Sequence, residues 1–367
     1  SMQKKLIALA IAGMAAAPAF AQSNVTIYGV ADVYYGYGKS DDGNKFSGIN
    51  SGGLSGSRLG FKGTEDLGNG LKALFVYEFG SLALDTGSGI TTTRQSYVGL
   101  GGNWGTLVAG RLQSPGYDFG VKYDALGAAV FSPVGQLTDN AGMTISGRDA
   151  GARLDNAAAY ISPNFGGVTL KAAYAFGEQI KTKEETGGVK SPQNVWALAA
   201  DYDNGPLSVG AVWHDLNHIG GTGFDEPRLD QTEWALGASY DFTVVKLTGN
   251  YQQAKIKLRG EGFDDTVKYK LWNIGAAVPV GPGAIKVAYA DWRENQDSCD
   301  GDCRARSWAL DYEYGLSKRT TAYVGYSQIR NKNANGFFLR NYTGLSTTGD
   351  SSSPKSQQVG FGVRHVF

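Results

Sequence analysis

The sequence predicts an all-β fold, a transmembrane antiparallel β-barrel of sixteen strands. Three observations predict this fold. Apolar and polar residues alternate along almost every segment, aromatic residues lie at segment ends, and short and long connectors alternate as far as the C-terminus. Alternation is the pattern of a strand that faces two different solvents. Aromatic residues at the ends of the apolar face are typical of the girdles at the two membrane interfaces.

Residues 1–21 are expected to be an export signal. Two lysines, an apolar stretch rich in small residues and the sequence Ala19-Phe20-Ala21 fit the three parts of a cleavable signal. The apolar stretch is too short and too rich in alanine to favour the alternative, an N-terminal anchor helix. Ser1, ahead of the methionine, is expected to be an addition to the natural chain. Residues 22–367 are then expected to form a single barrel domain.

The charge balance excludes one class of partner. The chain has 34 basic and 34 acidic residues, and the signal holds two lysines and no acid. The mature chain therefore has 32 basic and 34 acidic residues, a net charge of −2. A nucleic-acid partner would require a basic footprint, so none is expected. After cleavage no apolar run is long enough for a transmembrane helix.

The strands follow in order along the chain. In the first segment, Val25, Ile27 and Val33 fall on one face and Thr26 and Asp32 on the other. The polar face carries charged, amide and small residues, as a wet lumen requires. Further alternating segments lie at 71–80, 168–176, 196–202, 207–213, 234–240, 245–251, 308–314 and 357–367.

The connectors provide an independent signal. Short turns are expected at 65–70, 101–105, 162–167, 203–206, 241–243, 279–283 and 315–318. Long polar connectors are expected at 38–55, 81–92, 112–152, 179–192, 215–230, 256–265, 294–305 and 331–356. Seven short turns on the periplasmic side and eight long external loops join sixteen strands. An even number lets the barrel close without an open edge, and sixteen strands leave an aqueous channel.

Several stretches resemble the general porins of β-proteobacteria and neisseriae. They are SRLGFKGTEDLGNGLKALFVYEFG, RQSYVGLGGNWGTLVAGR, RLDNAAAYISPNFGG, YGLSKRTTAYVGY and VGFGVRHVF, in order along nearly the whole mature chain. The resemblance implies a homotrimeric outer-membrane channel for passive diffusion of small hydrophilic solutes and ions. It also implies a third external loop folded into the pore and a weak preference for anions through stacked arginines. Outer-membrane lipid, lipopolysaccharide and the barrel-assembly machinery, which would recognise the terminal Phe367, are the expected partners.

Charged residues of the expected constriction come from two parts of the chain. Alternation directs Arg58 and Lys62 to the lumen, and the resemblance assigns Arg94 and Arg153 to the constriction. Glu78 and Arg111 are further candidates for the same wall. Arginine suits this role because its guanidinium keeps its charge and is weakly hydrated. One unit charge acts on an ion about 4 Å away in water with about 1 kcal/mol, so we expect weak selectivity. The open alternative is that acids neutralise these charges.

The longest connector, 112–152, is expected to supply the acidic side of the constriction. A structureless connector of this length is usually functional. Its acids alternate with aromatic residues, which suits a loop packed on the wall with its carboxylates turned to water. These acids are Asp118, Asp124, Asp139 and Asp149.

The two cysteines, Cys299 and Cys303, are expected to form a disulfide in the seventh external loop, because export places them in an oxidising compartment. A metal pair with the neighbouring aspartates is the alternative. No other metal or cofactor site is expected, since the three histidines lack metal-ligand spacing. His214, on the lumen face, and His218, in an external loop, are expected to be solvated, and His365 lies near the C-terminus.

Other functions remain as alternatives. An enzyme is not expected, because no nucleophile and base can be placed together. A substrate-selective channel would need an aromatic track in the lumen, and Tyr28, Tyr34 and Trp292 face inward by alternation without falling on one track. An adhesin or receptor would depend on the external loops.

Overall fold

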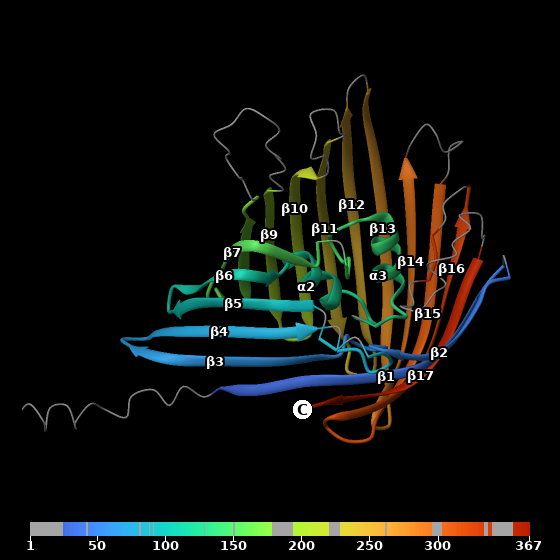
Figure 1. The fold of residues 1–367 in the computed structure, drawn as a ribbon, viewed down its shortest axis with the longest axis horizontal. Coiled ribbons are helices and arrows are strands. Elements are labelled where there is room, and N and C mark those ends of the chain that lie inside the picture. The colour runs from blue at the N-terminus through green and yellow to red at the C-terminus, as the bar shows by residue number, and fades with distance from the viewer. Residues whose placement is uncertain are drawn as a thin grey trace, which may run out of the picture.

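The computed structural model describes residues 25–41, 43–80, 82–87, 89–90, 92–127, 129–149, 151–177, 194–219, 228–260, 263–295, 303–333, 337–339 and 355–367. Seventeen antiparallel strands form one closed sheet around two short helices (Figure 1). Pairing of the first strand with the last, from Val30 opposite Val366 to Ser40 opposite Ser356, closes it. The predicted signal, residues 1–21, lies outside the described residues.

The strands run in sequence order around the wall. The first eight are β1 (Thr26–Ser40), β2 (Lys45–Ser51), β3 (Arg58–Gly68), β4 (Leu71–Gly80), β5 (Thr92–Gly102), β6 (Gly105–Gln113), β7 (Arg153–Ile161) and β8 (Val168–Ala175). The others are β9 (Asn194–Asn204), β10 (Leu207–Ile219), β11 (Arg228–Asp241), β12 (Lys246–Gly260), β13 (Phe263–Val280), β14 (Gly283–Asn295), β15 (Cys303–Gly315), β16 (Thr320–Lys332) and β17 (Lys355–Val366). Each of the seven predicted short turns contains a junction between two consecutive strands, although several of the predicted turn residues belong to the strands themselves.

The wall has sixteen strands because β2 and β3 are two pieces of one. Both pair with β1: β2 with its second half, from Val33 onward, and β3 with its first half, up to Val30. Residues 52–57 leave the wall between the two pieces. The backbone amides of Gly53, Leu54 and Ser55 donate to the buried carboxylate of Asp32 at 3.1, 2.8 and 2.9 Å. The prediction of an external connector over 38–55 is therefore wrong, since most of that segment is strand.

The strands also extend further than expected elsewhere. The segment 256–265, predicted as a long connector, lies mostly in the hairpin of β12 and β13. Aliphatic side chains cover the outer face, as Val98, Leu236 and Ile274 show, with exposed fractions of 63, 54 and 57%. No helix among the described residues is long and apolar enough to span a membrane.

Two helices lie inside the barrel, in the connector between β6 and β7 (Figure 1). Helix α2 (Pro115–Lys122) and helix α3 (Pro133–Ala141) each begin with proline after a serine cap. The hydroxyls of Ser114 and Ser132 accept the amides of Tyr117 and Gly135 at 3.1 and 3.0 Å. Serine caps followed by proline are the pattern that begins a helix. The prediction that the third loop folds into the pore is confirmed, and we call residues 114–152 loop 3.

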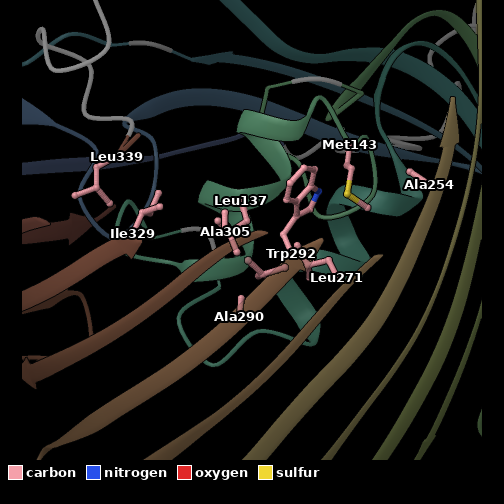
Figure 2. Packing of buried hydrophobic residues seen from close by; sticks show 10 residues of the cluster. Leu137, Met143, Ala254, Leu271, Ala290, Trp292, Ala305, Ile329 and Leu339 are labelled. Atoms are coloured by element: carbon pink, nitrogen blue, oxygen red, sulfur yellow. The ribbon is translucent and has the colours of Figure 1, made fainter. Parts of the chain in front are cut away.

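Loop 3 is held against the wall by an apolar core (Figure 2). Leu137 and Met143, both fully buried, pack with Leu271, Trp292 and Ile329 of the wall. Leu271, Trp292 and Ile329 belong to β13, β14 and β16. These strands lie across the lumen from β6 and β7, which loop 3 connects. Loop 3 therefore fills part of the barrel and narrows what remains.

Candidate functional site

A cluster of charged residues lies on β3, β4 and β5 where loop 3 leaves the wall. The guanidinium of Arg94 donates from Nε to Oε1 of Glu78 at 2.7 Å. The Nε of Arg58 lies 3.8 Å from the other oxygen of Glu78, and the hydroxyl of Tyr28 donates to that oxygen at 3.0 Å. Two arginines thus share one carboxylate.

Loop 3 supplies the next layer of this cluster. The guanidinium of Arg153 lies over the ring of Tyr117, 4.5 Å from its centroid. Arg94 and Tyr117 line the same cavity, so both arginines lie near the hydroxyl of Tyr117. Burial alone would raise the pKa of Tyr117, but the nearby positive charges of Arg94 and Arg153 outweigh this effect and lower that pKa. Tyr117 therefore joins the arginines of β5 and β7.

The cluster opens onto a cavity of about 550 Å³ that crosses the barrel. Lys286 of β14 and Glu313 of β15, paired at 2.6 Å, also line this cavity, and Arg364 of β17 lines it two strands away from β3. Arg364 lies opposite Asp32 in register, but the Asp32 carboxylate already accepts three amides and the hydroxyl of Tyr323. No ion pair joins Arg364 to an acid among the described residues. Arg364 therefore adds positive charge to the cavity on the side of the arginine cluster.

The charge balance of the cavity is positive. Four basic and three acidic side chains line it, namely Arg58, Arg94, Lys286 and Arg364, and Glu78, Asp124 and Glu313. Arg153, stacked on Tyr117, raises the basic count to five, so the balance is five minus three, or +2. Arg364 follows outward-facing Val363, so alternation in the last strand contained a signal for it. The sequence reasoning missed both Arg364 and Lys286 because all of its candidates lie in the first half of the chain.

The acids of loop 3 do not face these arginines as predicted. The carboxyl of Asp124 is buried and accepts the hydroxyl of Ser132 at 2.6 Å. Burial raises the pKa of Asp124 to about 6. The side chain of Asp139 is 2% exposed and lies 3.4 Å from Arg148. The expectation that these two carboxylates turn to water is wrong, because both hold the loop together from within.

The remaining two acids lie away from the arginine cluster or at the surface. Asp118 pairs with Lys171 of β8 at 3.1 Å, on the side of α2 that faces β8 to β10. Lys122 bridges Asp201 and Asp203 on the same side, at 3.0 Å to each. Asp149 is exposed. These ion pairs attach α2 to the wall and keep Asp118 away from the arginine cluster.

The two further basic candidates, Lys62 and Arg111, lie on opposite faces of the barrel wall. Lys62 lies 5.1 Å from the ring centroid of Tyr28 and so adjoins the cluster. Arg111 is opposite Ser96, which shares the outer face with exposed Val98. Arg111 pairs there with Asp155 and donates to the carbonyl of Thr93 at 2.6 Å. The prediction that Arg111 lines the constriction is wrong, because its side chain lies outside the barrel.

His214 is buried, contrary to the expectation that it is solvated. Its Nε2 accepts the amide of Gly116 at 3.1 Å, and its Nδ1 is 2.9 Å from the hydroxyl of Thr144. Thr144 also donates to Glu233, which accepts the amides of Thr144 and Ile145 at 2.7 and 3.1 Å. His214 and Glu233 therefore anchor both ends of loop 3 to β10 and β11. Alternation placed His214 on the correct face, but its partners come from the folded loop.

The aromatic residues that face inward form no track. Trp292 and Tyr34, 1 and 2% exposed, are covered by loop 3 and pack against Phe337 and Phe131. Tyr28 lies in the arginine cluster. This arrangement gives no support to a lumen path of stacked rings.

The remaining predictions concern the C-terminal phenylalanine, the two cysteines and two of the histidines. Phe367 exchanges backbone hydrogen bonds with Gly29 at 2.9 and 3.1 Å and is 47% exposed. Cys303 is disulfide-bonded, while Cys299 lies outside the described residues, so their pairing stays a prediction. His218 lies in β10, and its side chain is not described. His365 is near the hydroxyl of Thr320, at 2.9 Å.

A model of the family described as Gram-negative porin matches residues 8–334. The chain belongs to the Gram-negative porin family. Porin 32 of Delftia acidovorans is 37% identical over the full length of both chains. A porin of Bordetella pertussis is 30% identical over the full length of both, and the P.IB protein of Neisseria gonorrhoeae is 30% identical over 88% of this chain and 92% of its own.

A solved porin has the same architecture. The anion-selective porin from Comamonas acidovorans superimposes with a TM-score of 0.79 at 33% identity, covering 94% of this porin and all of that chain. This porin is thus a closed sixteen-stranded barrel of the Gram-negative outer membrane, and its lumen forms a pore.

Proposed function

We propose that this porin conducts small hydrophilic solutes and ions passively, with a weak preference for anions, and has no catalytic role. The observation that carries the proposal is the arginine cluster. Arg58 and Arg94 share the carboxylate of Glu78, Arg153 lies over the ring of Tyr117, and the predicted loop acids are buried, paired elsewhere or at the surface. The similar porin from Comamonas acidovorans is described as anion-selective. The selectivity of that porin supports the same sign here.

The expected preference is small. Charges in a water-filled pore act through a high dielectric, and one unit charge about 4 Å away contributes about 1 kcal/mol. A balance of +2 along the cavity then biases ion occupancy several-fold and leaves size as the main filter. Salt weakens this bias further, because the screening length is about 3 Å at molar ionic strength.

We also propose that the protein is a homotrimer, exported with its signal at 1–21 removed and inserted through recognition of the strand that ends at Phe367. One solved protein of the same fold, from Vibrio cholerae, has a trimer form. Phe367 pairs with β1 where the barrel closes, so this end of the chain completes the wall.

A planar-bilayer measurement tests the anion preference. Zero-current potentials in a dilute salt gradient should favour anions in the wild type and shift toward cations in Arg94→Gln and Arg153→Gln. Arg111→Gln is the matched control, since it removes an arginine on the outer face. The proposal is wrong if the wild type shows no anion preference, or if the control shifts the potential as much as the two cluster variants.

A further inference from the structure

The segment between β2 and β3 is larger than a bulge that merely bends a strand. We call residues 52–57 the inner turn. In register, Ser51 lies opposite Val33 and Arg58 opposite Val30, so the inner turn faces only two residues of β1. A β-bulge usually adds a single residue. The inner turn is therefore an element of its own, which leaves the wall and lines the lumen cavity.

A single residue of β1, Asp32, holds almost the whole inner turn. Its carboxylate accepts three successive amides, and its carbonyl accepts the amide of Gly52 at 2.7 Å. At the other end, the hydroxyl of Ser57 accepts the amide of Asp32 and donates to its carbonyl, both at 3.0 Å. Successive amides in a turn form a concavity that favours an anion, and here a carboxylate of the same chain occupies it. Asp32 is fully buried and is not among the described residues that line the cavity, so it acts on the lumen through the turn.

The inner turn borders the arginine cluster directly. The carbonyl of Gly56 accepts Nη1 of Arg58 at 3.1 Å. A Cβ on Gly56 would lie 3.5 Å from Nη1 of Arg94. Leu54 and Ser55 line the cavity together with both arginines. The turn therefore forms part of the lumen surface at the point where these guanidinium groups lie.

The inner turn is also joined to loop 3. The carbonyl of Gly53 accepts the amide of Val130 at 2.7 Å, and Leu54 belongs to the same buried apolar cluster as Val130 and Tyr323. The hydroxyl of Tyr323 is the fourth donor to the carboxylate of Asp32, at 2.5 Å. A Cβ on Gly53 would lie 2.0 Å from that hydroxyl. Position 53 therefore has no room for a side chain while these contacts are in place.

We propose that the inner turn is a second inward-folded element of the constriction, beside loop 3, and that Asp32 is the positioning residue that holds it there for the anion filter. The inference rests on the proposed anion preference and deepens it. The charge of Asp32 and its positioning role have opposite consequences. Loss of the charge alone would make the lumen more positive and favour anions. Loss of the turn would widen the lumen and free Arg58 from its acceptor, so the field on a passing anion would weaken.

Asp32→Asn separates these two effects in planar bilayers and in proteoliposomes. An asparagine has one acceptor oxygen, so two of the four donors lose their partner. We expect the zero-current potential in dilute salt to shift toward cations, and the liposomes to swell in neutral sugars that the wild type excludes. Asp311→Asn is the matched control, since Asp311 is another fully buried acid of the wall. It should keep the wild-type size limit and should not shift the potential toward cations.

Two alanine variants change the inner turn without changing its charge. Gly53→Ala forces the hydroxyl of Tyr323 away and should give the same shift and the same swelling as Asp32→Asn. Gly56→Ala has room for its methyl group and should behave like the wild type. Gly56→Asp, at the same open position, serves if Asp32→Asn and Gly53→Ala do not fold. It places a carboxylate beside Arg94 and should shift the potential toward cations relative to Gly56→Ala.

Three results would each overturn the inference. They are a shift of Asp32→Asn toward anions, an unchanged sugar limit in folded Asp32→Asn and Gly53→Ala, and equal potentials for Gly56→Asp and Gly56→Ala. The swelling assay uses uncharged solutes and so does not depend on the anion preference. A higher sugar limit in the variants of a porin whose wild type prefers no ion would reject the proposed selectivity and still support the inner turn as part of the constriction.

Discussion

The guanidinium of Arg153 lies 4.5 Å from the ring centroid of Tyr117, at the start of the first helix of loop 3. This contact connects a wall strand to the loop, and the same tyrosine lines the cavity together with Arg94. Tyr117 therefore packs against one arginine of the cluster and lies next to a second.

Replacing Tyr117 should weaken the anion preference without removing any charge. In Tyr117→Leu both arginines lose a partner, and their guanidinium groups become free to move into the lumen. We expect the zero-current potential to move part of the way toward that of Arg153→Gln. Tyr117→Phe keeps the ring and should retain more of the preference than Tyr117→Leu. Identical potentials for Tyr117→Leu and the wild type would remove this tyrosine from the filter.

Replacing Glu78 should act in the opposite direction. Glu78→Gln removes the carboxylate shared by Arg58 and Arg94, so the cavity balance rises by one charge. We expect anion occupancy to gain a few tenths to about 1 kcal/mol, measured as a larger zero-current potential in dilute salt. Asp155→Asn, which removes an acid from the outer face, is the control. A shift toward cations in Glu78→Gln would contradict the prediction.

Asp124 should make stability depend on pH. Its pKa is about 6 in the folded protein, through burial, against about 3.9 in an unfolded chain. Below pH 4 the group is neutral in both states, and above pH 6 the folded state bears the cost of a buried charge. The free energy of unfolding should therefore fall by about 3 kcal/mol between pH 4 and pH 6, then level off.

Urea unfolding in detergent measures this slope. Asp124→Asn should lack it, while Asp149→Asn, a change at an exposed loop acid, should keep it. Curves for the wild type and Asp124→Asn that stay parallel from pH 4 to pH 7 would show that this carboxyl keeps an ordinary pKa.

The packing of loop 3 against β16 depends on the absence of a side chain at Gly325. A Cβ on Gly325 would lie 2.5 Å from the ring of Phe131, which is fully buried. Gly325→Val should displace that ring at a cost of about 1–3 kcal/mol. We expect noisier single-channel currents as the loop moves. Gly48→Val, where the nearest atom would be 3.4 Å away, is the control and should give currents as quiet as those of the wild type.

The fold could be predicted because a barrel wall obeys a local rule. Each strand separates two solvents, so the period of two is visible in the sequence segment by segment. The break between β2 and β3 could not be predicted in this way. Residues 52–57, between these two strands, have the composition of a loop. They fold inward because their amides donate to the carboxylate of Asp32, which is distant in the sequence.

Within the candidate site, the sequence grouped Arg58, Arg94, Arg153 and Glu78, which also lie together in the structure. It wrongly added Arg111 to this group. The register shifts between Gly110 and Leu112, so alternation fails there. Gly110 has φ +141°, a conformation that favours glycine. The burial of Asp124, Asp139 and His214 depends on tertiary contacts of loop 3, for which one sequence contains no signal.

Loop 3 also imposes an order on folding. The amide of Gln136 donates to the hydroxyl of Ser327, 191 residues later, and the amide of Val130 donates to the carbonyl of Gly53. The loop cannot reach its final position before the last strands have joined the wall, and contacts this distant form slowly. A barrel that has not closed has no narrow section. Leakage of bulky solutes would then report unfinished folding, and a tight size limit would indicate that the chain is complete to its last strand.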